Sequence, residues 1–314
     1  KKMEDERFPI IDISKLVESQ GKDEAILNEA AKELMDGFSK WGFIYLRGHP
    51  IAKESIEKMF RDSEGFFKQP IEKKNEVLID GADIDYVMGY VPFKKQTFDY
   101  SKPFDLKEAF DYMHHMKPEM KSKLSPAFFE LFKDFFTQCH DLTLLLFRLL
   151  ATSLGLEDLE FFHKAHDKLG RLGNTSIMRS LYYPAKEKSE ILEEQSRCSE
   201  HTDYGTITLL FPKSKGLEVK SPSGHFIKAK VIPGTIVVNA ADLLERWSSG
   251  RIKSTPHRVT IQTSDMSKPR QSMAFFVSPD NDCLVECLDG SNKYEPVNSF
   301  KYLDGRFKYN MIKS

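Results

Sequence analysis

The sequence predicts a mainly β protein, a sandwich or jelly roll whose strands are wrapped by flanking N-terminal helices. Three observations lead to this fold class. Helical spacing of apolar residues dominates the first half of the 314-residue chain, short β-rich runs dominate the second half, and clusters of Gly, Pro, Ser and Asn separate those runs. Helices are needed in such a fold because the outer apolar face of a strand barrel must be covered from water.

Two segments have clear helical spacing. Residues 23–40 place their apolar side chains on one face. Residues 126–154 form a longer pattern, with Ser125 as the N-cap, Pro126 as the first helical residue and Gly155 as the stop. The many Phe and Leu side chains of this second segment predict a helix buried in the core and not a ligand site.

Short runs separated by turn residues predict the strands. Two occur early, at 9–13 and 42–46, and we expect them to join the later sheet system. Six follow in the second half, at 176–183, 206–211, 226–231, 235–239, 257–262 and 271–277. Side chains alternate along a strand, so residues i and i+2 face the same side.

Charge and composition narrow the class of partner. Lys and Arg number 46 against 47 Asp and Glu, which gives a net charge of −1. Without a basic excess we expect no nucleic-acid partner, and a small molecule is the expected partner. No apolar run reaches the roughly 18 residues of a membrane span, so no membrane partner is expected. Four cysteines are too few for a disulfide scaffold and predict reduced thiols in the cytoplasm.

A candidate metal site begins at His201-Thr202-Asp203. The i, i+2 rule directs His201 and Asp203 to one side, and a second histidine, His257, opens another predicted strand. Two imidazoles and one carboxylate are the donor set that holds Fe(II) on one face and leaves about three positions for a co-substrate and O2. A His-x-Asp alone is more often a hydrogen-bonded strand pair, so other signals must support the metal.

A candidate anion site follows thirteen residues after His257, where Arg270 and Ser272 share one face of a strand. A guanidinium binds a carboxylate through two parallel hydrogen bonds, and a hydroxyl adds a third. The apolar run at 273–277 predicts a buried strand, and a buried arginine needs an anion. That anion is either the distal carboxylate of a dicarboxylic acid or a structural Asp or Glu. Tyr183 could offer its hydroxyl to the same carboxylate.

Together these motifs resemble the isopenicillin N synthase-like 2-oxoglutarate/Fe(II) oxygenases, over nearly the whole chain. The segments that carry the resemblance are Phe8-Pro9-Ile10-Ile11-Asp12, Gly42-Phe43-Ile44-Tyr45-Leu46, Gly89-Tyr90-Val91-Pro92, Asp105-Leu106-Lys107-Glu108, His201-Thr202-Asp203-Tyr204-Gly205, Val238-Asn239-Ala240-Ala241-Asp242, Ser254-Thr255-Pro256-His257-Arg258-Val259 and Arg270-Gln271-Ser272. The resemblance implies a double-stranded β-helix core with iron at one end. It also implies an N-terminal domain at 1–125 and a core at 126–314, which carries the spine helix, the β-helix and a C-terminal lid segment.

The resemblance assigns roles to the candidate residues. It implies that the metal ligands, which form the catalytic centre, are His201, Asp203 and His257. It implies that the anchors for the far carboxylate of 2-oxoglutarate are Arg270, Ser272 and Tyr183. Within the family the chain looks most like the fungal thymine dioxygenases, which implies a pyrimidine substrate such as thymine. Tyr204 and Phe276 would then sandwich a flat ring and Arg179 would hydrogen-bond it, although these residue types recur widely in the family.

The implied reaction uses Fe(II), 2-oxoglutarate and O2, and couples oxidative decarboxylation of 2-oxoglutarate to hydroxylation of a small organic molecule. Three alternatives stay open. They are a family oxidase that does not use 2-oxoglutarate, a catalytically silent binding protein on the same fold, and a hydrolytic zinc enzyme, which lacks an obvious general base here. Among the other histidines, His163 and His166 are predicted to lie on a solvated helix because Lys164 and Lys168 surround them.

Overall fold

Eight strands form the larger of two sheets in the computed structural model, which describes residues 7–79, 88–261 and 267–310. The sheet order is β1-β2-β10-β7-β12-β5-β4-β3, and every neighbouring pair is antiparallel except β1 with β2. The strands are β1 (Ile10–Asp12), β2 (Phe43–Arg47), β3 (Gly89–Val91), β4 (Glu108–Tyr112), β5 (Ile177–Tyr183), β7 (Ile207–Pro212), β10 (Thr235–Ala240) and β12 (Arg270–Val277).

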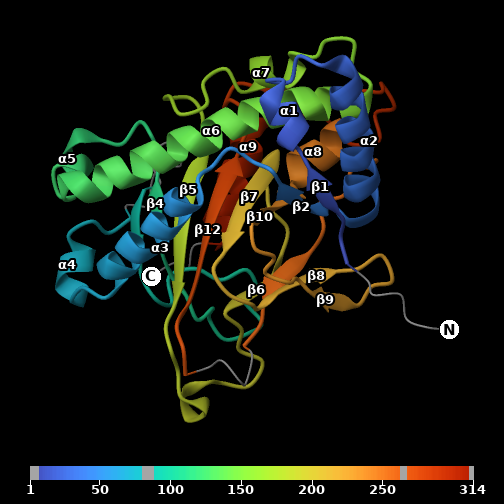
Figure 1. The fold of residues 1–314 in the computed structure, drawn as a ribbon. Helices are drawn as coiled ribbons and strands as arrows, with labels where there is room; N and C mark the ends of the chain where they lie inside the picture. Colours follow the sequence, from blue (N-terminus) through green and yellow to red (C-terminus); the bar gives the residue numbers. More distant parts are fainter. Residues whose placement is uncertain (1–6, 80–87, 262–266, 311–314) are drawn as a thin grey trace.

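A smaller sheet covers the inner face of the larger one (Figure 1). Its order is β6-β11-β8-β9, and its strands are β6 (Cys198–His201), β8 (Leu217–Lys220), β9 (Phe226–Lys228) and β11 (His257–Val259). Phe43 and Val237 of the larger sheet share an apolar cluster with Val219 of the smaller sheet. Two sheets that pack face to face are the jelly-roll arrangement that the sequence predicts. A short pair, β13 (Leu284–Val285) with β14 (Val297–Asn298), lies outside both sheets.

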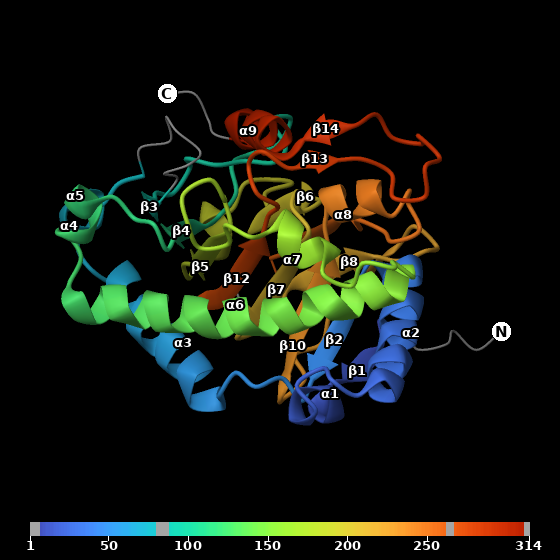
Figure 2. The same cartoon turned by 90° about the horizontal axis from the view of Figure 1, so that it is seen from above.

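Helices pack around the larger sheet, mainly on its outer face. They are α1 (Ser14–Glu18), α2 (Glu24–Trp41), α3 (Lys53–Phe67), α4 (Ile71–Asn75), α5 (Pro118–Lys121), α6 (Pro126–Leu154), α7 (Phe161–Ala165), α8 (Asp242–Trp247) and α9 (Ser299–Asn310), with a 3₁₀ turn, η2, at Lys188–Glu190. Figure 2 shows α6 and α9 on opposite sides of the larger sheet. Among the described ranges, no helix is both long and apolar enough to cross a bilayer.

The long helix α6 is the spine of this covering layer. It begins and ends at the predicted residues, because the Ser125 hydroxyl accepts a hydrogen bond from the Phe128 amide and Gly155 adopts a left-handed φ of 72°. Phe136 of α6 packs edge-on against Phe275 of β12, with ring centroids 4.9 Å apart. The prediction of a buried core helix is therefore confirmed.

The predicted strands are found with changed ends, and six strands were not predicted. The predictions at 226–231 and 257–262 are too long, since β9 spans only Phe226–Lys228 and β11 only His257–Val259. Residue 262 lies outside the described residues. The strands that were missed are β3, β4, β6, β8 and the short pair β13 and β14. Every residue of β4 is buried, including Glu108 and Asp111, so this strand lacks the polar and apolar alternation on which the prediction depends.

Strands from both predicted domains contribute to the larger sheet. β1, β2, β3 and β4 come from residues before 126, and they pair with strands from the second segment. The division at 125 and 126 remains a prediction, since a shared sheet neither requires nor excludes two evolutionary modules.

Candidate metal centre and substrate cavity

Two histidines and one aspartate converge where β6 pairs with β11. His201 ends β6 and His257 opens β11, and the two are direct partners in the antiparallel register. Asp203 lies two residues further along, with its Oδ1 3.8 Å from His201 Nε2 and 3.7 Å from His257 Nε2. One ligand atom of each side chain lies within 4.8 Å of the other two. The three side chains that the sequence marks as metal ligands therefore meet at one point.

Each imidazole is held by a backbone carbonyl on its far side. His201 Nδ1 lies 2.8 Å from the Ser199 carbonyl oxygen, and His257 Nδ1 lies 3.1 Å from the Thr255 carbonyl oxygen. A carbonyl can only accept, so both Nδ1 atoms carry the proton and donate, which leaves each Nε2 lone pair directed at Asp203. Burial lowers the pKa of both imidazoles, to about 4 for His257, and so favours the neutral form that binds metal.

The carboxylate of Asp203 is held in the same manner. Its Oδ2 accepts hydrogen bonds from the Thr208 hydroxyl at 2.6 Å and from the Asn239 side-chain amide at 2.7 Å. Oδ1 is left to face the two imidazoles. Burial acts to raise the pKa of Asp203, but the nearby His257 and His201 and these two hydrogen bonds together hold it below its usual value. Two neutral imidazoles and one ionised carboxylate fit the needs of Fe(II).

Sequence reasoning missed three residues around this centre. Thr208 and Asn239 stood in motifs but received no role, and Phe98 was not considered. The Phe98 ring stacks on His201, with centroids 4.1 Å apart and an interplanar angle of 7°. Asn239 could have been found from its position, because it is the one polar residue in the apolar run 236–240. Phe98 carried no such signal, since its segment forms no strand or helix in the structure.

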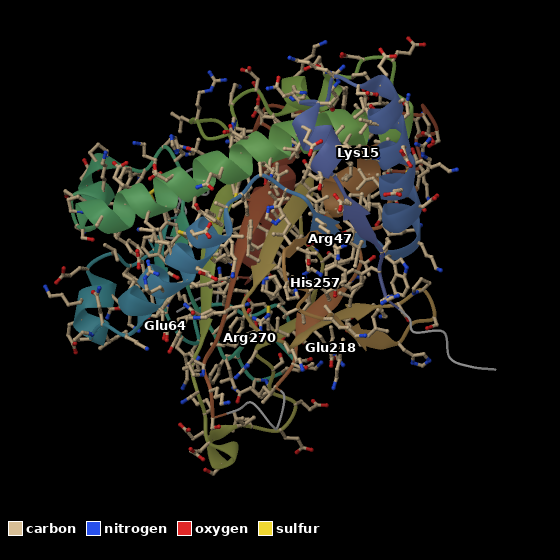
Figure 3. All side chains as sticks on the ribbon, in the orientation of Figure 1. Lys15, Arg47, Glu64, Glu218, His257 and Arg270 are labelled. Atoms are coloured by element: carbon tan, nitrogen blue, oxygen red, sulfur yellow. The ribbon has the colours of Figure 1, made fainter. Side chains whose placement is uncertain are left out.

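The candidate anchor residues lie side by side on the inner face of the larger sheet. Arg270 of β12 and Tyr183 of β5 are register partners, and Ser272 follows Arg270 on the same face. The Arg270 guanidinium is 2% exposed and lies over the Tyr183 ring, with its Cζ 4.8 Å from the ring centroid. In Figure 3, Arg270 and His257 both lie near the middle of the molecule.

Within residues 7–79, 88–261 and 267–310, the guanidinium of Arg270 has polar contacts but no anionic partner. Its Nε donates to the Lys215 carbonyl oxygen at 2.9 Å, and its terminal nitrogen donates to the Ser272 hydroxyl at 3.1 Å. No carboxylate of the described residues forms an ion pair with it. The structural Asp or Glu that the sequence left open as a partner is therefore not found in the described part of the chain.

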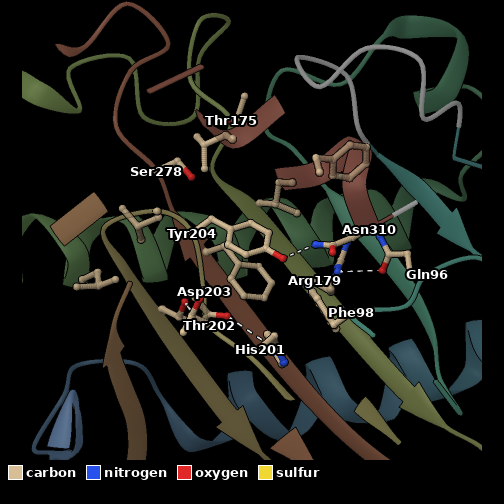
Figure 4. Close-up of a pocket in the computed structure, with 18 residues that line it drawn as sticks. Gln96, Phe98, Thr175, Arg179, His201, Thr202, Asp203, Tyr204, Ser278 and Asn310 are labelled. Carbon is tan, nitrogen blue, oxygen red and sulfur yellow. Dashed lines mark hydrogen bonds and ion pairs between the residues drawn. The ribbon is translucent and has the colours of Figure 1, made fainter. Parts of the chain in front are cut away.

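A cavity of about 120 Å³ lies beside His201 and Asp203 (Figure 4). Its lining includes the three predicted substrate residues, Arg179, Tyr204 and Phe276. The apolar part of the lining comes mainly from Phe98, Ile177, Ile207, Phe276, Leu303 and Phe307. The polar part includes Tyr204, whose hydroxyl accepts a hydrogen bond from the Asn310 side-chain amide, and Arg179, whose guanidinium donates to Gln96 Oε1 at 3.3 Å.

The prediction for His166 is wrong. His166 is 2% exposed, just after α7, and does not lie on a solvated helix. Its Nδ1 donates to the Phe162 carbonyl oxygen at 2.7 Å and its Nε2 accepts from the Thr206 hydroxyl at 2.7 Å. Lys164 is exposed and Lys168 is half-buried, but neither lysine reports on the burial of the histidine, because only one face of so short a helix meets water.

Two protein-family models match the chain. One, described as the N-terminal part of the non-haem dioxygenases in morphine synthesis, matches residues 8–131, and the other, the 2OG-Fe(II) oxygenase superfamily, matches residues 174–279. The chain belongs to the 2OG-Fe(II) oxygenase superfamily. A proline hydroxylase from Petromyces alliaceus is 31% identical, with 91% of each chain covered. A 2-oxoglutarate-dependent dioxygenase from Talaromyces stipitatus is also 31% identical, again with 91% of each covered.

Solved structures of this superfamily share the fold. Full-length thymine 7-hydroxylase from Neurospora crassa, in complex with alpha-KG and thymine, is 36% identical, covers 96% of each chain and has a TM-score of 0.82. Its complex with alpha-KG and 5-formyluracil covers 95% of this chain and 94% of that one, at 36% identity and a TM-score of 0.80.

These similarities confirm the predicted family, the double-stranded β-helix core and the enzyme class. The protein is an oxygenase that uses Fe(II), 2-oxoglutarate and O2, and it couples the oxidation of 2-oxoglutarate to the oxygenation of a small molecule.

Proposed function

We propose that His201, Asp203 and His257 are the protein ligands of the catalytic Fe(II). The observation that carries this proposal is the convergence of two Nε2 atoms and one Oδ1 within 4.8 Å, each fixed by hydrogen bonds behind it. Neutral imidazoles and an anionic carboxylate leave a net charge of +1 around Fe(II), which favours an anionic co-substrate. When bound, Fe(II) and 2-oxoglutarate supply the activation of O2, with succinate and CO2 as products.

The same proposal makes Arg270, Ser272 and Tyr183 the anchors for the distal carboxylate of 2-oxoglutarate. Arg270 is buried without a carboxylate partner in the described part of the chain, and such a cation is stable only when an anion or several dipoles compensate it. The guanidinium would bind the carboxylate, and the two hydroxyls would donate to it. This grip orients the co-substrate along the inner face of the sheet, with its other end toward His201 and His257.

The substrate that this cavity supports best is a small flat ring, a pyrimidine such as thymine. Tyr204 and Phe276 both line the cavity and offer ring faces, and Arg179 lies at its polar end. The named complex of the Neurospora thymine 7-hydroxylase with thymine supports the same class of substrate. The mostly apolar walls would exclude water from the reacting carbon, while polar groups at one end would set which carbon lies nearest His201 and Asp203.

The test is an anaerobic titration with Fe(II) and 2-oxoglutarate, followed by O2 and a succinate assay against a panel of substrates. Thymine, related pyrimidines, amino acids and small terpenoid acids form the panel. We expect thymine to stimulate succinate release in step with its own oxidation. No stimulation by thymine would remove the pyrimidine proposal, and substrate oxidation without any succinate would favour an oxidase that does not use 2-oxoglutarate.

We also propose a cytoplasmic location. The support is that all four cysteines are free thiols in the structure, as expected in a reducing compartment. Fusion of the full chain to a fluorescent protein in its native host would test the location.

A further inference from the structure

Arg179, the cation at the polar end of the cavity, is held by a carboxylate on the neighbouring strand. Asp111 of β4 and Arg179 of β5 are register partners. The guanidinium Nε lies 2.6 Å from Oδ1 of Asp111, and its NH2 nitrogen lies 2.6 Å from Oδ2, so the pair is bidentate. Asp111 is 0% exposed, so bulk solvent does not reach its carboxylate.

This pairing removes the net positive charge from the substrate side of the site. Among the described residues that line the cavity, Arg179 is the only arginine or lysine. Two other cations near the cavity walls are paired too, since Lys107 lies 2.9 Å from Asp105 and Arg306 lies 3.3 Å from Asp242.

Arg270, on the co-substrate side of the site, differs from Arg179 in its pairing. It has no carboxylate partner in the described ranges and faces the co-substrate side, which must accept a dianion. The chain therefore uses one guanidinium with its charge available and one with its charge cancelled.

The paired guanidinium can still recognise a neutral molecule. Two of its five N–H bonds go to Asp111 and one goes to Gln96, which leaves two without a partner among the described residues. Its Cζ lies 5.9 Å from the centroid of the Phe276 ring, so the free edge stays next to a wall of the cavity. A carbonyl oxygen of an uncharged ring can accept from this edge, whereas a substrate carboxylate would meet the buried charge of Asp111 with no spare cation to offset it.

We propose that Asp111 is a specificity-determining residue that makes the site select uncharged, flat, hydrogen-bond-accepting substrates over anionic ones. This rests on the proposed function, because it places the substrate ring between Tyr204 and Phe276. It goes further in naming the charge of the substrate and the residue that selects it. Asp111 acts through Arg179 and does not itself line the cavity.

Binding of matched neutral and anionic ligands to the holoenzyme tests the proposal. The enzyme is loaded anaerobically with Fe(II) and 2-oxoglutarate, and ligands are titrated by calorimetry in two pairs, uracil with orotate and nicotinamide with nicotinate. Each pair keeps the ring and changes the charge. The wild type should bind each neutral member at least about tenfold more tightly than its anionic partner. Equal or tighter binding of the anions would overturn the proposal.

The variant Asp111→Asn separates charge from shape. It keeps the size and one hydrogen bond of the side chain but frees the charge of Arg179. We define the ligand gap as the Kd of the anionic ligand divided by the Kd of its neutral partner. We expect this ligand gap to shrink about tenfold in the variant, mainly because the anions bind more tightly. A gap that stays as wide as in the wild type would mean that shape sets the preference, and the proposal would fail. If this variant does not fold, the wild-type titrations still decide.

Glu108→Gln is the matched control. Glu108 lies on the same strand and forms a buried ion pair with Lys74 at 2.6 Å, but neither residue lines the cavity. Its substitution should lower the free energy of unfolding and leave the ligand gap unchanged. A smaller ligand gap in this variant would show that any change of buried charge alters selectivity, which contradicts the proposal.

The substrate panel also separates this proposal from the proposed pyrimidine substrate. If neutral ligands bind more tightly than anionic ones but thymine is not oxidised, only the pyrimidine substrate is overturned. If thymine is oxidised but neutral and anionic ligands bind equally well, only the role of Asp111 is overturned.

Discussion

The atoms of His201, Asp203 and His257 that we propose as metal ligands owe their direction to the groups behind them. Both Nδ1 atoms donate to backbone carbonyls, and Oδ2 of Asp203 accepts from Thr208 and Asn239. Each side chain therefore has one free ligand atom and little freedom to turn it away. Residues that never touch the metal can accordingly change its affinity.

Asn239→Ala should weaken Fe(II) binding by roughly 10- to 100-fold, because Asp203 loses one of the two hydrogen bonds that direct its Oδ1. The measurement is anaerobic competition with a chelator, which needs no turnover. Asn298→Ala is the matched control, since the Asn298 amide donates to the Asn281 carbonyl oxygen and contacts none of the three ligands. Unchanged metal affinity in the Asn239 variant would show that Thr208 alone suffices.

Arg270→Met should weaken 2-oxoglutarate binding by about 2–5 kcal/mol, because a buried carboxylate would lose its charged partner. The affinity is measured anaerobically from the visible absorption that develops when 2-oxoglutarate binds the Fe(II) enzyme. Ser272→Ala should cost about 1.5–3 kcal/mol, the value of a hydrogen bond to a charged group. An Arg270 variant with wild-type affinity for 2-oxoglutarate would contradict the anchor assignment.

At the scale of elements, the site depends on which strands become neighbours. Alternation along a strand was enough to predict that His201 and Asp203 face one side, and that Arg270 and Ser272 share another. The pairing of β6 with β11, which makes His257 the partner of His201, could not be predicted because register depends on contacts distant in sequence. β4 was missed for a related reason, since its buried charges find partners only in the folded chain.

His166, which lies where α7 meets the start of β7, should make the free energy of unfolding depend on pH. Burial lowers the pKa of His166 from 6.5 to about 3, so between these values the unfolded chain binds a proton that the folded chain does not. The free energy of unfolding therefore falls as the pH falls through this window, by up to about 1.4 kcal/mol per pH unit from this one residue. His166→Gln should remove that part of the slope in urea unfolding measured across the window. Identical slopes for the variant and the wild type would contradict this account.

At the scale of the whole molecule, the cavity draws on segments from far apart in the chain. Gln96 and Phe98 come from a loop before β4, Phe276 comes from β12, and Phe307 and Asn310 come from α9 (Figure 4). The sequence predicted a lid in the C-terminal segment through family resemblance, but not which of its side chains reach the site. That choice depends on how α9 docks, and its weak amphipathic pattern leaves the docking face open.

Phe307→Ala should raise the KM for the true substrate by about tenfold or more, because a half-buried phenyl group on the cavity wall contributes on the order of 1.5–3 kcal/mol. Fe(II) and 2-oxoglutarate affinities should not change. Phe300→Ala is the matched control, being half-buried on the same helix but absent from the cavity lining. Equal effects of both variants on KM would mean that α9 acts only through stability.

The central claim is that one iron binds to His201, Asp203 and His257. Anomalous X-ray scattering at the iron edge, from crystals grown anaerobically with Fe(II) and 2-oxoglutarate, tests it most directly. We predict a single strong peak in contact with those three side chains, with the distal carboxylate of 2-oxoglutarate against Arg270. A peak at other residues, or one that includes only some of the three, would contradict the claim.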